Sequence, residues 1–99
     1  MTTAARKLLT IVAESGLEGR LVSVLHDAGA KGFTVSTAHG EGPRGMRASD
    51  ISGGNVRSES VVTEQAAEIV LGKLEKDYFP HYAVTCWMTD VQVVREDRY

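Results

Sequence analysis

Two segments of the chain repeat apolar residues every three or four positions, which is the spacing of an amphipathic helix. Their apolar stripes are Leu17, Leu21, Val24, Leu25 and Ala28 in the first, and Ala67, Val70, Leu71, Leu74 and Tyr78 in the second. Ser15 and Glu18 have capping-box spacing before the first segment, and Thr63 is a favourable N-cap for the second. Pro80 ends the second segment, because the residue before proline avoids helical geometry. The pattern therefore predicts two helices, each with one face to bury.

Four other segments have strand character. Residues 8–13 form a short, nearly continuous apolar run, which is typical of a strand buried on both faces. Residues 33–38, 55–62 and 82–94 alternate or are rich in β-branched and aromatic residues. The predicted order is β-α-β-β-α-β, a ferredoxin-like split βαβ arrangement of the α+β class. We expect one domain over residues 1–99, an antiparallel sheet with both helices on one face.

The second face of this sheet needs a cover. The first strand is apolar on both faces, and the last strand spreads apolar residues over both. A domain of 99 residues buries only about 60–65% of the surface that its unfolded chain exposes. A symmetric homo-oligomer is the economical way to cover the exposed face.

Charge and cysteine content limit the classes of partner. The net charge of −2 gives no general attraction to nucleic acid or to an anionic membrane. The apolar run at residues 8–13 is too short to span a bilayer. The single cysteine excludes an internal disulfide and fits a reducing compartment. We expect a cytoplasmic protein with no nucleic-acid partner and no direct membrane insertion.

The segment from Gly40 to Gly54 has no hydrophobic period and holds five of the ten glycines. Closely spaced glycines let backbone N–H groups turn toward an anion. Arg44 and Arg47 add forked donors that suit phosphate, carboxylate or bicarbonate. A solvated hairpin loop is the alternative interpretation, since short glycine motifs often occur without function. A connection of this length is more typical of a functional loop.

Other polar residues give weaker signals. Arg57 and Glu59 share one side of a predicted strand, where they meet solvent or a ligand. Arg95 and Arg98 follow the last strand, which can bring them toward the loop of a neighbouring subunit, or they belong to a solvated tail. His39, His81 and Cys86 have no recognised metal-ligand spacing, and the chain has no catalytic motif context. We therefore expect neither a metal site nor an enzyme.

Taken in order, several stretches resemble one family. The passage from Ala28 to Val35, followed by Gly40-x-Gly42, resembles the helix-to-strand passage of PII signalling proteins. Residues 40–47 resemble the start of the T-loop in the PII-like branch associated with carboxysomes and bicarbonate transporters. Residues 55–59 and 77–83 resemble the corresponding stretches of that branch. The resemblance extends from residue 7 to residue 94.

The resemblance implies a ferredoxin-like homotrimer that is a non-enzymatic signalling protein. Such a trimer would bind adenine nucleotide in clefts between subunits, with bicarbonate as a candidate second ligand. The T-loop, about residues 40–54, would change with the ligand and contact an unknown protein target, in inorganic-carbon or carboxysome metabolism. The glycine- and lysine-containing B-loop of standard PII proteins is absent here. The implied ligands are therefore AMP or ADP in preference to ATP.

The resemblance also implies site residues, position by position. The nucleotide-binding set is Gly40, Glu41, Gly42, Arg44, Arg47, Arg57, Glu59 and Arg95. The bicarbonate-binding set is Arg44, Gly45, Met46 and Arg47. Three alternatives stay open: a metal-sensing or metal-tolerance trimer that uses His39, His81 or Cys86, a weak nucleotide hydrolase, and an oligomeric scaffold without a ligand.

Overall fold

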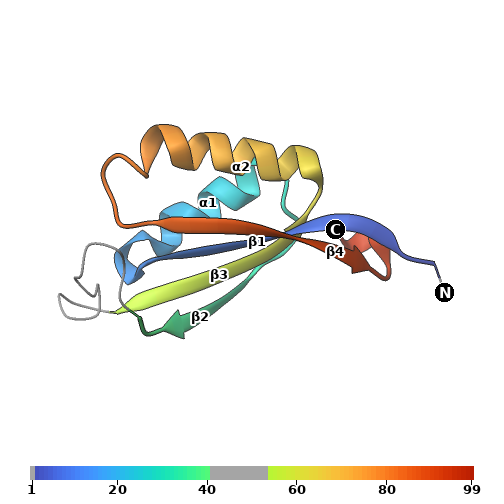
Figure 1. Cartoon of the computed structure of the whole chain (residues 1–99), viewed down its shortest axis with the longest axis horizontal. Coiled ribbons are helices and arrows are strands. Elements are labelled where there is room, and N and C mark those ends of the chain that lie inside the picture. Colours follow the sequence, from blue (N-terminus) through green and yellow to red (C-terminus); the bar gives the residue numbers. More distant parts are fainter. Residues whose placement is uncertain (1, 41–53) are drawn as a thin grey trace.

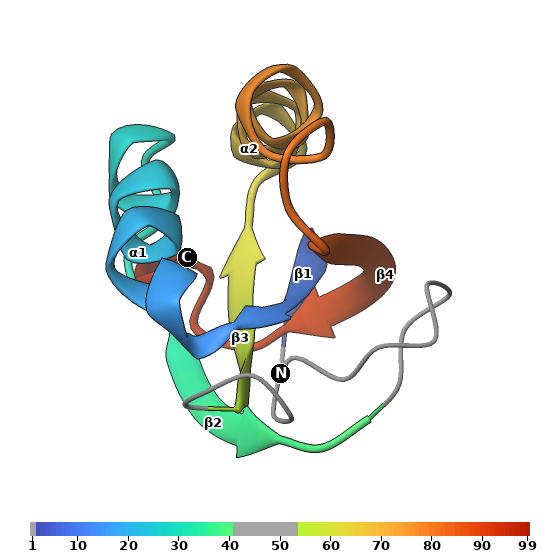
Figure 2. The ribbon, with the colours of Figure 1, turned by 90° about the vertical axis from the view of Figure 1, so that its left-hand side faces the viewer.

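The computed structural model describes residues 2–40 and 54–99. The elements are β1 (Ala4–Glu14), α1 (Glu18–Asp27), β2 (Thr34–Ala38), β3 (Asn55–Val62), α2 (Glu64–Asp77) and β4 (Thr85–Val93). The 3-10 helix η1 (Ser15–Leu17) precedes α1, and the 3-10 helix η3 (Glu96–Arg98) follows β4. Every strand pair is antiparallel in the order β2-β3-β1-β4, and both helices lie on one face (Figures 1 and 2). The predicted ferredoxin-like α+β fold is confirmed.

The core lies between the helices and the sheet. Its buried apolar members are Leu9, Ile11, Ala13, Leu17, Leu21, Val24, Leu25, Ala28, Val62, Ala66, Ala67, Val70, Leu74, Tyr78 and Val84. The whole predicted stripe of the first helix is buried. In α2 the stripe is shifted slightly, because Ala66 is buried while Leu71 is only partly covered.

The two predicted helix starts had different outcomes. The hydroxyl of Thr63 accepts a hydrogen bond from the amide of Ala66 at 3.2 Å, so the N-cap of α2 is confirmed. The capping box at Ser15 and Glu18 is wrong, because η1 intervenes and the N-cap position of α1 falls on Leu17. A 3-10 turn moves the helix start two residues along, so the two side chains no longer occupy the capping positions.

Strand β1 is longer than its apolar run predicts. Residues 4–7 continue it, and Ala4 pairs with Val93 while Lys7 pairs with Asp90. Strand β4 starts at Thr85, three residues later than predicted, because residues 78–82 form a turn after α2. Hydrogen bonding to a long neighbouring strand therefore sets the ends of β1 more than its own hydrophobicity does.

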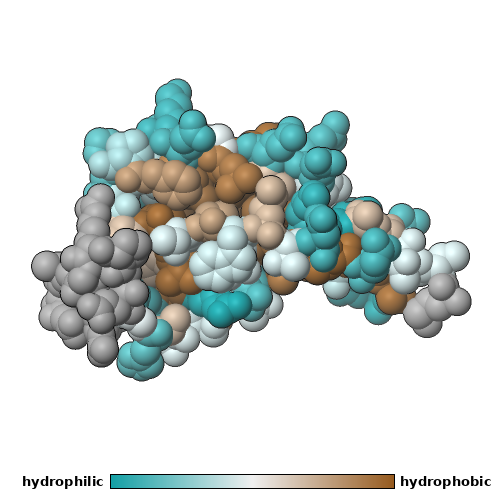
Figure 3. Space-filling view, viewed as in Figure 1, coloured by the Kyte–Doolittle hydropathy of each residue, from teal (hydrophilic) through white to brown (hydrophobic). Residues whose placement is uncertain are grey.

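The second face of the sheet is covered by neither helix (Figures 1 and 2). Leu9, Ile11 and Ala13 point to the helices, so Leu8 and Thr10 point the other way. Trp87 of β4, the register partner of Thr10, is 45% exposed on this face. Apolar side chains also gather over β4 in the middle of Figure 3. An exposed apolar area on a small domain is typical of an interface.

Candidate functional site

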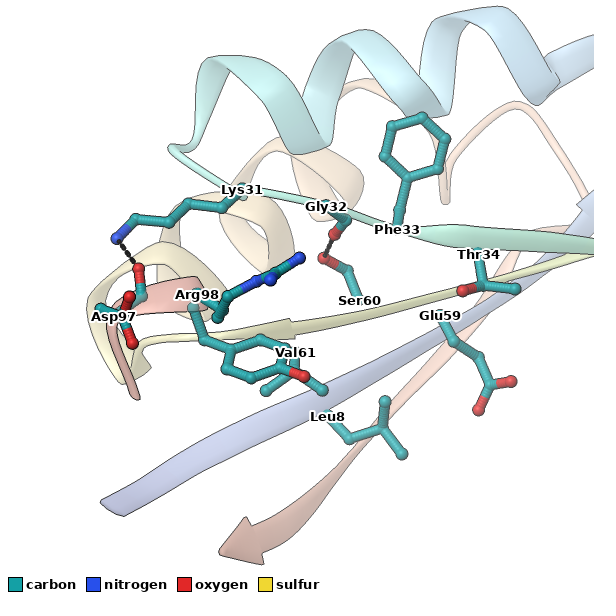
Figure 4. A pocket seen from close by; sticks show the side chains of 11 residues that line it. Leu8, Lys31, Gly32, Phe33, Thr34, Glu59, Ser60, Val61, Asp97 and Arg98 are labelled. Carbon is teal, nitrogen blue, oxygen red and sulfur yellow. Dashed lines mark hydrogen bonds between the residues drawn. The ribbon is translucent and has the colours of Figure 1, made fainter. Parts of the chain in front are cut away.

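A pocket of about 640 Å³ lies where the connection from α1 to β2 meets the sheet and the C-terminal turn (Figure 4). The rim contributes residues 31–34, the sheet contributes Leu8 of β1 and residues 59–61 of β3, and the C-terminal turn contributes residues 97–99. Three segments that are distant in sequence thus form one pocket.

The end of α1 fixes the rim of this pocket. Gly29 has a φ of 97°, a conformation that favours glycine. Its amide donates to the carbonyl of His26 at 3.0 Å, and the amide of Ala30 donates to the carbonyl of Leu25 at 3.0 Å. This is the Schellman pattern, which ends the helix and redirects the chain. The Ser60 hydroxyl then donates to the carbonyl of Gly32 at 2.6 Å and ties the rim to β3.

A second serine on β3 differs from Ser60 in its hydrogen bonding. The hydroxyl of Ser58 is buried, with its side chain on the helix-facing side, and it has no hydrogen-bond partner among the described residues. We expect Ser58→Ala to raise the free energy of unfolding by about 0.5–1 kcal/mol, because an unsatisfied buried hydroxyl is removed. Ser60→Ala is the matched control and should lower it by about 1 kcal/mol, because the carbonyl of Gly32 loses its donor. Chemical denaturation would measure the free energy of unfolding of both variants. An equal loss of stability in the two would contradict the difference in hydrogen bonding between the Ser58 and Ser60 hydroxyls.

The open face of β3 carries a graded series of side chains. Val61, Glu59 and Arg57 follow one another on the same side, at steps of about 6.6 Å, and Asn55 is the first residue of the strand. The apolar end of the series meets Leu8, the register partner of Val61. Figure 4 places Glu59 beside Thr34 at one end of the pocket, and Lys31 with Asp97 at the other. Along β3 the side chains on this face thus change from apolar (Val61) to negatively charged (Glu59) to positively charged (Arg57).

Arg57 has two neighbours on this face. Its guanidinium is 3.8 Å from a carboxylate oxygen of Glu59 and 5.9 Å from the ring centroid of Trp87. Both charged side chains are partly exposed, so this ion pair contributes less than about 1 kcal/mol. Arg57 is therefore held over the indole but can still meet an anion.

Among the predicted site residues, Arg57 and Glu59 are brought together, and Gly40 lies exposed just beyond β2. Arg95 lies far from the start of β3. Val93, two residues before Arg95, pairs with Ala4 at the start of β1, whereas Asn55 pairs with Glu14 at its end. The length of β1, about 33 Å, therefore separates Val93 from Asn55. Within the chain, Arg95 therefore does not approach Asn55. The predicted residues Glu41, Gly42, Arg44, Gly45, Met46 and Arg47 lie outside the described residues.

Several pocket residues were not assigned to a site from the sequence. Leu8, Thr34, Val61 and Tyr99 belong to this group, and Arg98 lines the pocket where Arg95 does not. Strand alternation was the available signal for Thr34 and Val61. Nothing local in the sequence indicates that the C-terminal turn crosses back to β3.

The residues of the metal alternative do not gather. His39 is exposed beyond β2, and His81 is exposed in the turn after α2. Cys86 packs against the core, where burial raises the pKa of its thiol to about 11. Among residues 2–40 and 54–99, no three histidine, cysteine or acidic side chains lie close enough to hold a metal ion. In the same residues no helix is long and apolar enough to cross a bilayer.

Fold and pocket together define a small ferredoxin-like α+β domain with a ligand-sized pocket at one end of its sheet. The chain belongs to the nitrogen regulatory protein P-II family, whose model matches residues 6–98. A comparison with curated protein sequences found no match.

Solved structures of PII-like proteins resemble the whole chain. A candidate PII-like signaling protein from Thermus thermophilus is 45% identical, with a TM-score of 0.86, and the match covers 100% of this chain and 99% of that one. A nitrogen regulatory PII-like protein from Thiomonas intermedia, solved with ADP, AMP and bicarbonate, is 22% identical. Its TM-score is 0.89, and the match covers 98% of this chain and 95% of that one. At 22% identity, the second likeness shows a shared fold.

Proposed function

We propose that this chain is a non-enzymatic signalling protein that binds AMP or ADP across the graded face of β3. The graded series Val61, Glu59, Arg57 carries the proposal, because it matches the order of base, ribose and phosphate in a nucleotide. A flat base would pack on the apolar wall of the pocket, and the Glu59 carboxylate would accept hydrogen bonds from ribose hydroxyls. The phosphates would extend toward Arg57 and toward loop 40–54, where Arg44 and Arg47 supply further donors.

A short phosphate chain suits this site better than a triphosphate. The connection between α2 and β4 covers only residues 78–84, and it contains no lysine or arginine. The third phosphate of ATP would add charge with no further cation from that connection. Bicarbonate is the proposed second ligand, held by residues 44–47, since a planar anion also suits forked arginine donors. The Thiomonas intermedia protein, which was solved with ADP, AMP and bicarbonate, supports this pairing of ligands.

We propose that a homotrimer is the working form and that nucleotide binds near the boundary between subunits. The exposed Trp87 on the face of the sheet away from the helices supports this, because it would be buried against another copy. The ligand would favour one conformation of loop 40–54, which then contacts a protein target in the cytoplasm. A role in inorganic-carbon or carboxysome metabolism follows if bicarbonate changes the affinity for nucleotide.

One calorimetric series tests the proposal. AMP, ADP, ATP and cyclic AMP are titrated into the protein with and without bicarbonate, after sedimentation has established the oligomeric state. We expect AMP or ADP to bind at least tenfold more tightly than ATP, and bicarbonate to shift one of these affinities. Absence of binding by every nucleotide would overturn the proposed function, and tighter binding of ATP would overturn the preference.

A further inference from the structure

The Arg57 side chain reaches across the face of the sheet that neither helix covers. Arg57 lies on β3 and Trp87 lies on β4, and β1 runs between these two strands. The guanidinium of Arg57 is nevertheless only 5.9 Å from the ring centroid of Trp87. Neighbouring strands are about 4.8 Å apart, so the side chain passes over β1 to reach the indole.

Thr10 of β1 lies next to the path of this side chain. Its register partners on the two neighbouring strands are Glu59 and Trp87. Thr10 points away from the helices, and yet it is only 1% exposed. Arg57, which passes over β1 beside it, accounts for this burial together with the two register partners. The position of Arg57 therefore decides how much of Thr10 and of the Trp87 ring solvent can reach.

The two contacts that hold Arg57 in this position are weak. Its guanidinium is 3.8 Å from a carboxylate oxygen of Glu59, and both side chains are partly exposed. Its contact with Trp87 is a cation–π contact to an indole that is 45% exposed. Forked hydrogen bonds from a guanidinium to a phosphate are stronger than either kind of exposed contact. A phosphate within reach would therefore take the guanidinium from Trp87.

From these contacts we propose that Arg57 has two positions and transmits nucleotide binding to the Trp87 side of the sheet. The proposal rests on the proposed function, because the ligand that moves Arg57 is the nucleotide. Without ligand the guanidinium lies over the indole. With AMP or ADP bound, the ribose engages Glu59 and the phosphates engage Arg57, so that Trp87 and Thr10 become uncovered. This face is the one proposed to contact another subunit, so nucleotide would act on that contact as well.

The fluorescence of Trp87 tests the movement, because the chain has a single tryptophan. Saturating ADP should change its emission intensity by about a fifth or more, since a cation leaves the face of the ring. In Arg57→Gln, which has no cation to move, saturating ADP should give less than about a quarter of that change. Arg20→Gln is the matched control, because the Arg20 guanidinium lies 6.0 Å from the ring of Tyr82 and its loss should leave the Trp87 response intact.

A double-mutant cycle tests the coupling from the other side. Trp87→Leu removes the contact that competes with phosphate, so ADP should bind about two- to fivefold more tightly. In the Arg57→Gln background the same change should alter ADP affinity by less than about 1.5-fold, because no guanidinium remains to be released. Trp87→Phe keeps a ring with weaker cation–π attraction, so its gain should be smaller, and it completes the cycle if Trp87→Leu does not fold.

Sedimentation and thermal melting, with and without ADP, select the variants that keep the fold and the oligomeric state of the full chain. An unchanged Trp87 emission in the full chain, or an equal change in Arg57→Gln, would overturn the movement of Arg57 while the proposed function stands. An equal effect of the Trp87 substitution in both backgrounds would overturn it too. If calorimetry detects no nucleotide binding to the full chain, the proposed function fails and the coupling fails with it.

Discussion

Replacing Leu21 with alanine is expected to lower the free energy of unfolding by about 3 kcal/mol. Leu21 is fully buried, and its side chain lies in the middle of the α1 stripe that packs on the sheet. Leucine-to-alanine changes in cores cost about 2–5 kcal/mol, since the lost transfer energy adds to the energy of the cavity. A domain of this size has about 5–15 kcal/mol in total, so the loss is a large fraction of its stability. The melting temperature should fall by roughly 12–24 °C.

Ile69→Ala is the matched control for this experiment. Ile69 is on α2 and is 58% exposed, so its replacement should change the free energy of unfolding by no more than about 0.5 kcal/mol. Urea denaturation of both variants at one protein concentration makes the comparison, because dissociation of an oligomer also contributes to apparent stability. Equal losses at the two positions would mean that Ile69 is buried in an interface, or that the core is not where the structure places it.

The helices and most strands were predictable because their signals are local. The stripe from Leu17 to Ala28 repeats at the helical period, and every one of its members is buried. The alternation from Asn55 to Val62 predicted β3 with the correct bounds. Thr63 was found because an N-cap bonds a backbone amide only three residues away. In each case the residues that decide the structure lie next to one another in the sequence.

The missed features depend on partners that are distant in sequence. Residues 4–7 are strand because β4 pairs with them, and no pattern within those residues reveals this. The pocket exists because the C-terminal turn crosses to β3, where Asp97 meets Lys31 across 66 positions of sequence. Arg98 lines the pocket and Arg95 does not, because the chain turns back toward β3 only after Arg95, which has a left-handed conformation. The pair Arg57 and Glu59 was found because strand alternation is again a local rule.

The proposed orientation of the nucleotide makes Glu59 the most informative position for binding. We expect Glu59→Ala to weaken ADP binding roughly tenfold or more, because hydrogen bonds to a charged group contribute about 1.5–3 kcal/mol. Glu59→Gln keeps an acceptor oxygen without the charge, so its loss should be smaller, about three- to fivefold. Calorimetry with ADP measures both, and Glu68→Ala on the exposed side of α2 is the control, with a change of less than twofold.

The sign of the Glu59 result separates two orientations of the ligand. If the base packs on Leu8 and Val61, the carboxylate meets ribose hydroxyls and its removal weakens binding. If the phosphates instead lay beside Glu59, their negative charge would be repelled by its carboxylate, and Glu59→Ala would strengthen binding. Removal of the carboxylate should leave stability within about 0.5 kcal/mol, because its ion pair with Arg57 is partly exposed. A gain in ADP affinity in a variant of unchanged stability would therefore contradict the proposed orientation, in which the Glu59 carboxylate meets the ribose.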